Sequence, residues 1–133
     1  MKNDKAAVAR TCLASAETDV MTFPQIIGML MQAGFESYEI NFRRETAIYY
    51  LIDGTSIELP THKTSTPVAP VLNVGTLQAA IKEAQQQVTG YSYKGFCEKA
   101  KTSGCAGYIV SLSGKRALYI GRDAGTHVEL FPQ

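Results

Sequence analysis

The chain has 133 residues, with 13 Lys and Arg against 12 Asp and Glu, 45% hydrophobic residues and 3 cysteines. This length fits one domain that buries a core without metal or disulfide staples. A net charge of +1 gives no field favouring nucleic acid or an anionic membrane surface. The sequence has no apolar run that could span a bilayer and no signal-peptide core after Met1, and its odd cysteine number fits a reducing compartment. We therefore expect a cytoplasmic protein with no membrane or nucleic-acid partner.

The N-terminal part predicts two helices. Asp4 can cap the first, which runs to about Glu17, and its apolar residues recur at helical spacing on one narrow stripe: Ala9, Cys12, Leu13 and Ala16. A second helix begins at Thr22, where Thr22 and Gln25 have capping-box spacing and Pro24 occupies the first turn. Gly34 supplies its left-handed end.

Three strands follow the second helix. Residues 36–43 alternate apolar and polar side chains, 47–52 are rich in β-branched and aromatic residues, and 55–59 form a return strand after Asp53-Gly54. Asp-Gly is a strong signal for a two-residue hairpin turn. Pro60, Pro67 and Pro70 then predict an extended connector over 60–75.

The second half of the chain predicts the same order of elements. Thr76 can cap a helix that runs through Val88, and Ser92 starts a shorter helix that Gly104 ends. Strands are predicted over 107–112, 117–122 and 126–131. Between the first two, residues 113–116 would suit a two-residue Gly-Lys turn, which places Tyr108 and Val110 on the face of Tyr119. A three-residue loop or a bulge would instead align Tyr108 with Leu118, and we favour the bulge because it keeps the apolar positions on one side.

An internal repeat accounts for this order. A shift of 70 positions superposes identical residues, namely Gly34 on Gly104, Tyr38 on Tyr108, Ala47 on Ala117, Tyr49 on Tyr119 and Asp53 on Asp123. One residue inserted after Asp123 also superposes Gly54 on Gly125 and Glu58 on Glu129. Repeats 4–59 and 76–131, joined by the connector, predict an α+β fold with a pseudo-twofold axis and helices on the apolar face of antiparallel sheet. Both one continuous sheet and two facing sheets satisfy this pattern.

The hairpins nominate one candidate site. A two-residue turn at Asp53-Gly54 sets Tyr49 opposite Glu58, and places Ile48, Tyr50 and Ile52 on the core face. With a turn one residue longer, Tyr119 lies opposite Glu129, and His127 shares the face of Glu129. A tyrosine beside a carboxylate can bind a polar ligand, and a His–Glu pair can perform acid–base chemistry. The alternative is that these pairs only decorate a solvated face.

No cofactor or metal site is expected from motifs. Cys97 and Cys105 are eight positions apart across a helix end, which is not a zinc spacing. Cys12 and Cys97 fall on apolar helix faces and are interpreted as small hydrophobic residues. No Gly-rich phosphate-binding loop occurs, since Gly104 to Gly107 fits a helix end that leads into a strand.

Several segments resemble a family of short bacterial and prophage-borne proteins of unknown function, often labelled "phage envelope protein". The resemblance extends nearly end to end and rests on these stretches: Gly34-Phe35-Glu36-Ser37-Tyr38, Ala47-Ile48-Tyr49-Tyr50-Leu51, Tyr91-Ser92-Tyr93-Lys94-Gly95-Phe96-Cys97, Gly104-Cys105-Ala106-Gly107-Tyr108 and Thr126-His127-Val128-Glu129. It implies a phage or mobile-element ancestry and assigns no catalytic residues.

Three functions are compatible with these patterns. The first is a non-enzymatic protein that binds a partner protein or itself, with an exposed aromatic patch around Tyr91, Tyr93 and the connector. The second is a small-molecule binding module, with a cleft between the repeats lined by Tyr49, Tyr119, Glu58 and Glu129. The third is an enzyme that uses His127 and Glu129, which ranks last because spacing alone assembles no set of nucleophile, base and orienting group.

Overall fold

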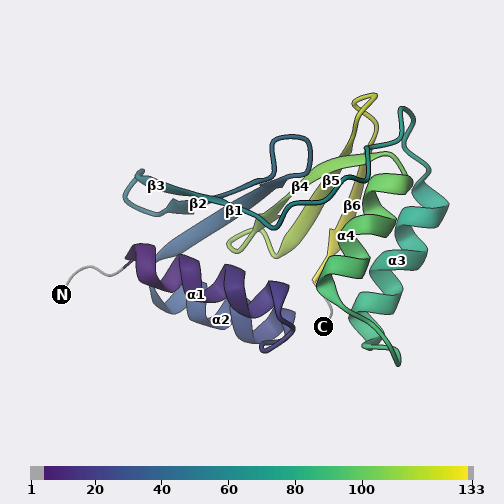
Figure 1. Cartoon of the computed structure of the whole chain (residues 1–133). Helices are drawn as coiled ribbons and strands as arrows, with labels where there is room; N and C mark the ends of the chain where they lie inside the picture. Colours follow the sequence, from purple (N-terminus) through teal and green to yellow (C-terminus); the bar gives the residue numbers. More distant parts are fainter. Residues whose placement is uncertain (1–4, 132–133) are drawn as a thin grey trace.

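The computed structural model describes residues 5–131 and contains two copies of a helix-helix-three-strand unit (Figure 1). The first copy comprises α1 (Lys5–Glu17), α2 (Phe23–Gln32), β1 (Phe35–Asn41), β2 (Thr46–Leu51) and β3 (Ser56–Pro60). The second comprises α3 (Val74–Gln86), α4 (Tyr93–Thr102), β4 (Cys105–Ser111), β5 (Arg116–Gly121) and β6 (Thr126–Leu130). The predicted α+β fold with an internal duplication is therefore confirmed.

The six strands form one antiparallel sheet in the order β3-β2-β1-β4-β5-β6, with the helices on one face (Figure 1). The sequence left open whether the repeats share a sheet; β1 and β4 join them at its centre. Glu39 lies opposite Ile109 in this pairing, and these two residues are related by the repeat shift of 70. The pseudo-twofold axis thus passes through this pair, and α1–α2 and α3–α4 lie on opposite sides of it.

The helix ends follow from local sequence. Thr22 caps α2 with the complete capping box expected from Gln25, and Ser92 caps α4 by accepting a hydrogen bond from the backbone N–H of Gly95. For α3 the prediction needs correction, because the cap is Asn73, whose side chain accepts from the backbone N–H of Thr76. Thr76 therefore lies inside the first turn, and the helix ends at Gln86, before Val88. Asn is as good a cap as Thr or better, so both assignments fit local propensity.

The predicted core face of β2 was wrong by one residue. Ala47, Tyr49 and Leu51 are buried against the helices, whereas Ile48, Tyr50 and Ile52 point to the open face. A one-residue change of register moves every side chain of a strand to the opposite face. The strand therefore buries Tyr49 and the small Ala47 beneath the helices and leaves Ile48 and Tyr50 partly in solvent.

The loop between β2 and β3 explains this difference. Leu51 pairs with Thr55 through a backbone hydrogen bond, which leaves a three-residue loop that ends on Gly54 in the left-handed region at φ +94°. In the second repeat Gly121 pairs with Gly125, and Ala124 takes the left-handed position at φ +69°. Both repeats thus have the same loop length, and the inserted residue that improved the sequence alignment does not exist.

The loop at 113–116 also differs from the prediction. Tyr108 lies opposite Tyr119 and Val110 opposite Ala117, so Tyr108 shares the face of Tyr119 and not that of Leu118. The bulge expected there was wrong, and the register irregularity lies instead at the start of β4, between Cys105 and Gly107. The reason is again the core face of β5, which is set by Ala117 and Tyr119.

The connector between β3 and α3 contains no helix or strand and runs across the helix side of the sheet (Figure 1). Its hydrogen bonds reach both repeats: His62 to the Glu17 carboxylate, Thr66 to the Glu98 carboxylate, and Ala69 to the Lys101 carbonyl. Near its end, Asn73 donates to the carbonyl of Ser103. The connector therefore seals one side of the space between the helix pairs.

Among the residues that the structure describes, no helix is long and apolar enough to cross a membrane.

Gly34 and Gly104 are equivalent positions, both at φ +93°, which yields a matched test of connector packing. A Cβ on Gly104 would lie 2.1 Å from the Val71 carbonyl oxygen, while one on Gly34 meets only the flexible Lys5 ammonium at 3.3 Å. Gly34→Ala should cost about 1 kcal/mol of unfolding free energy, from the left-handed backbone alone. Gly104→Ala should cost at least about 1 kcal/mol more, because the connector must move. Equal losses in urea unfolding would contradict this packing.

Candidate functional site

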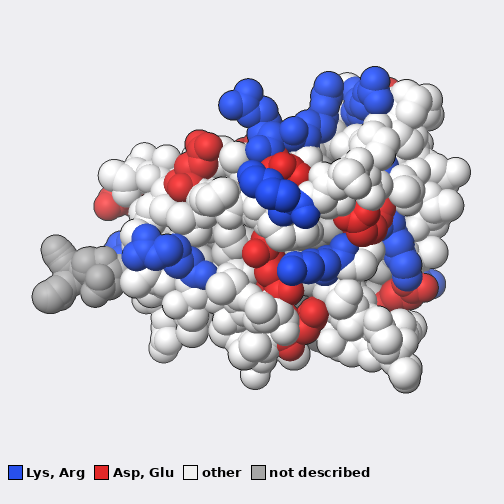
Figure 2. All heavy atoms as spheres, viewed as in Figure 1, with Lys and Arg blue, Asp and Glu red and all other residues white. Residues whose placement is uncertain are grey.

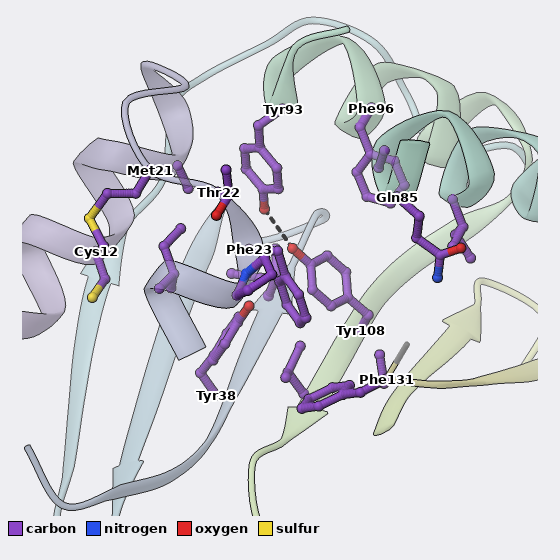
Figure 3. Close-up of a pocket in the computed structure, with 18 of the residues that line it drawn as sticks. Cys12, Met21, Thr22, Phe23, Tyr38, Gln85, Tyr93, Phe96, Tyr108 and Phe131 are labelled. Atoms are coloured by element: carbon purple, nitrogen blue, oxygen red, sulfur yellow. Dashed lines mark hydrogen bonds between the residues drawn. The ribbon is translucent and has the colours of Figure 1, made fainter. Parts of the chain in front are cut away.

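A cavity of about 420 Å³ lies between the two helix pairs and the sheet, on the pseudo-twofold axis (Figure 3). All four helices and the central strands contribute side chains to it. Its walls are largely apolar and unusually aromatic, with rings from Phe23, Tyr38, Tyr49, Tyr91, Tyr93, Phe96, Tyr108, Tyr119 and Phe131. The duplication thus places a cavity between the two helix pairs, above the sheet that both repeats share.

Two tyrosine pairs related by the repeat form the sheet side of the cavity. Tyr38 and Tyr49 stack with ring centroids 5.3 Å apart, and Tyr108 and Tyr119 lie 5.2 Å apart. All four residues are buried. The register places each pair on adjacent strands with both side chains toward the helices, so the rings pack across the strands.

The two repeats differ on the helix side at the first residue of α2 and of α4. Tyr93, in the first turn of α4, has its hydroxyl 2.7 Å from the Tyr108 hydroxyl (Figure 3). Its counterpart in α2 is Phe23, which has no hydroxyl to offer Tyr38. Phe23 instead packs edge-on against Phe131, with centroids 5.4 Å apart. The two repeat-related tyrosine pairs therefore differ in polarity, because the Tyr108 hydroxyl is hydrogen-bonded and the Tyr38 hydroxyl is not.

Four of the tyrosines in the walls are buried, and the hydroxyls of three of them have no hydrogen-bond partner within residues 5–131: Tyr38, Tyr49 and Tyr119. Burial raises the pKa of each of these phenols above its ordinary value. An unpaired polar group removed from water costs about 1–3 kcal/mol. The walls thus contain polar atoms that a molecule in the cavity could satisfy.

The rim of the cavity comes from three segments that are distant in sequence. They are the α1–α2 loop (19–22), the end of α3 with its following loop (Gln85, Gln87 and Tyr91), and the end of β6 (129–131). In Figure 3, Phe23 lies near the centre of the view with Phe131 below it, and Gln85 reaches in from α3. Because Val20 on this rim is 73% exposed, the apolar lining continues to the protein surface.

The charged groups of the lining are both acidic. Asp19 accepts a hydrogen bond from the backbone N–H of Tyr93, at 2.8 Å, and its charge adds to burial in raising the pKa of Tyr91 to about 12. Glu129 lies 2.8 Å from Nε2 of His127. Among residues 5–131, no Lys, Arg or His belongs to the lining.

The structure separates the residues that the sequence grouped into one site. Tyr49, Tyr119 and Glu129 line the cavity, and His127 bonds to Glu129 beside it. Glu58 does not contribute, because it lies opposite Ile48 on the exposed face of the sheet.

The predicted opposed pairs were wrong as well. Tyr49 lies opposite Ile57, and Tyr119 opposite His127, with centroids 6.4 Å apart. Glu129 is opposite Ala117 and therefore diagonal to Tyr119 on the same face. The shared face of Tyr119, His127 and Glu129 is nevertheless as expected, because alternate residues of a strand point the same way.

The sequence analysis missed two of the four tyrosines on the sheet side of the cavity, Tyr38 and Tyr108, and it misplaced two further aromatic residues. Tyr38 and Tyr108 were visible as an identical pair in the repeat, and the correct parity of β2 and β5 would have grouped them with Tyr49 and Tyr119. Tyr91 and Tyr93 were expected on an exposed patch, but they line the cavity. The signal was present in the repeat, and it was concealed by the two-residue turn assumed at Asp53-Gly54 and by the bulge assumed at 113–116.

The three cysteines are buried and carry free thiols. Cys12 lines the cavity, with its sulfur 3.5 Å from the Met29 sulfur. Burial raises the pKa of Cys97 to about 12 and that of Cys105 to about 11. These thiols stay protonated near neutral pH, so the expectation that Cys12 and Cys97 act as small hydrophobic residues agrees with their surroundings.

Comparison with protein families matches residues 11–128 to one described as "Protein of unknown function (DUF1398)". The chain belongs to this family. The match covers most of both repeats and all of the connector, so it includes every residue of the cavity lining except Glu129, Leu130 and Phe131. Comparison with curated proteins finds no match. The family description assigns no activity, and the cavity is the structural feature that bears most directly on function.

The buried tyrosines predict loss of stability at high pH. Their pKa values are raised in the folded protein, so above the ordinary phenol pKa of about 10 the unfolded chain releases protons that the folded chain retains. The stabilisation is complete at neutral pH and declines as pH rises above about 9 to 10. Urea unfolding across this range, with tyrosinate absorbance of the native protein, measures it. Titration of all 7 tyrosines near pH 10 in the native state would contradict the burial.

Proposed function

We propose that this protein binds a small molecule in the cavity between its two repeats. The main support for binding is the volume of the cavity, because about 420 Å³ falls within the range typical of small-molecule sites. Such sites are mainly apolar with few polar groups, and the aromatic walls with their unpartnered tyrosine hydroxyls match that composition. A purely structural core would be expected to close such a space, because native interiors pack with few voids larger than water.

The hydroxyls of Tyr38, Tyr49 and Tyr119 support a ligand with polar atoms as well as apolar surface. Filling the cavity with hydrocarbon alone would leave these groups unpaired, whereas a ligand carrying donors or acceptors would recover part of their desolvation cost. The rigid setting of the tyrosines on adjacent sheet strands favours a site that is formed before the ligand arrives. Binding therefore accounts for both the shape and the polarity of the cavity.

A neutral dye tests this proposal. N-phenylnaphthylamine, whose fluorescence rises in apolar surroundings, should bind the native protein saturably. Ala84→Phe should weaken binding at least about tenfold, because Ala84 lines the cavity from α3 and a phenyl group would occupy it. Ala79→Phe on the exposed side of the same helix is the matched control and should bind normally. Equal binding by both folded variants, or none by the native protein, would refute the proposal.

Self-association is a second candidate, supported by the open face of the sheet. Ile109, Leu118 and Val128 form one row across β4, β5 and β6, and Val128 is 46% exposed. Leu130, further along β6, is 59% exposed. An apolar patch of this kind can meet the same patch of a second copy across a twofold axis. This candidate retains the expectation of a homo-oligomer; the phage ancestry implied by the resemblance stays a prediction.

Sedimentation equilibrium over a range of protein concentrations tests the second candidate. A dimer should form, and Val128→Glu should weaken it at least about tenfold because two carboxylates would meet in the apolar patch. Val71→Glu is the control, since Val71 is 66% exposed but lies on the connector, away from the open face. A monomer at every concentration would exclude self-association and leave the cavity proposal unaffected.

A further inference from the structure

We infer that the ligand of the cavity is a positively charged amphiphile: an apolar or aromatic molecule that carries an ammonium group. This inference rests on the proposed function and specifies the ligand class. Three properties of the cavity lining support a cationic ligand: its aromatic rings, its acidic side chains and its unpartnered tyrosine hydroxyls.

The aromatic walls favour a cation over a neutral group. The faces of phenol rings carry negative potential, and a cation within about 6 Å of several rings is attracted to all of them, more strongly where water is excluded. Tyr38, Tyr49, Tyr108 and Tyr119 present two stacked or tilted pairs beneath the cavity, and Tyr93 and Phe96 stack above them with centroids 6.2 Å apart. A buried space enclosed by this many rings is the arrangement that recognises ammonium groups.

The charges of the rim have the sign that this ligand requires. Asp19 on the α1–α2 loop and Glu129 on β6 contribute from two sides, and no basic side chain of residues 5–131 lines the cavity. The lower margin of Figure 2, between the two helix pairs, likewise shows acidic side chains, and the basic side chains of this view lie above them, most of them toward the top. An anion entering this rim would meet only like charge, whereas a cation would be drawn in.

The carboxylates of the rim have no Lys or Arg partner among residues 5–131. Within residues 5–131, Asp19 forms no ion pair, and its one hydrogen bond comes from the Tyr93 backbone. Glu129 has only His127, and a neutral imidazole can donate its Nε2 proton to that carboxylate and leave the negative charge in place. The remaining lone pairs of both groups, with the unpartnered hydroxyl of Tyr38, can accept hydrogen bonds from an ammonium N–H.

Three probes of the same size and shape separate charge from apolar contact. Benzyltrimethylammonium is a cation, neopentylbenzene is its neutral isostere with carbon in place of nitrogen, and benzylsulfonate is a tetrahedral anion. Competition against the bound dye should show the cation binding at least about tenfold more tightly than the neutral isostere. The anion should not compete measurably.

Isosteric amides at the rim provide the variant test. Asp19→Asn keeps the acceptor for Tyr93 and suits the left-handed backbone at φ +58°, and Glu129→Gln keeps an acceptor for His127. Each should weaken the cation about threefold to tenfold and leave neopentylbenzene unchanged. Glu58→Gln, on the open face of the sheet, should change neither.

The outcomes distinguish this inference from the proposed function. If neopentylbenzene binds as tightly as the cation, or the amide variants leave the preference intact, the cavity binds ligands but the inference is wrong. If benzylsulfonate binds most tightly, the cavity prefers anions and the inference is also wrong. If neither the dye nor any probe binds, both the inference and the proposed function fail.

Discussion

The antiparallel pairing of β1 with β4 is the interaction on which the rest of the structure depends. It joins two copies of one unit edge to edge about an axis through Glu39 and Ile109, and it makes a single sheet whose one face must serve both helix pairs. Each helix pair packs on its own half, because its apolar stripe matches the apolar face of the strands that follow it in the chain. The space left over the axis is the cavity.

The connector makes that arrangement asymmetric. It occupies one side of the gap between the helix pairs, where it bonds to Glu17 of α1 and to Glu98 and Lys101 of α4. The opposite side stays open as the rim. A duplicated fold can therefore hold an open site on its axis, since the single chain that links the copies can close only one end. The acidic residues and the pair Phe23–Phe131 lie at the end that it leaves open.

Small departures from the repeat give the cavity its chemistry. Tyr93 pairs its hydroxyl with Tyr108, while Phe23 leaves the equivalent hydroxyl of Tyr38 without a partner in the described chain. His127 and Glu129 have no counterparts of the same type, since the same shift of 70 matches them to Ile57 and Leu59. Duplication supplies the scaffold and the rings, and divergence between the copies supplies polarity and charge. This division of roles agrees with function residing in sites placed on folds.

The sequence by itself determined the elements, because caps, left-handed glycines and apolar periodicity are local signals: Thr22, Gly34, Ser92 and Gly104 act as expected. It also determined the duplication. Only the tertiary structure decided which face of β2 and β5 is buried. In the first repeat, a two-residue turn at Asp53-Gly54 and the observed three-residue loop that ends on Gly54 differ little in sequence, yet they pair β3 with opposite faces of β2. In the second repeat the loop has the expected length of three residues, and only packing decided that Ala117 and Tyr119 are buried. Packing against the helices determines the buried face of each strand. It therefore places Tyr49 and Tyr119 inside a cavity that no local sequence pattern could specify.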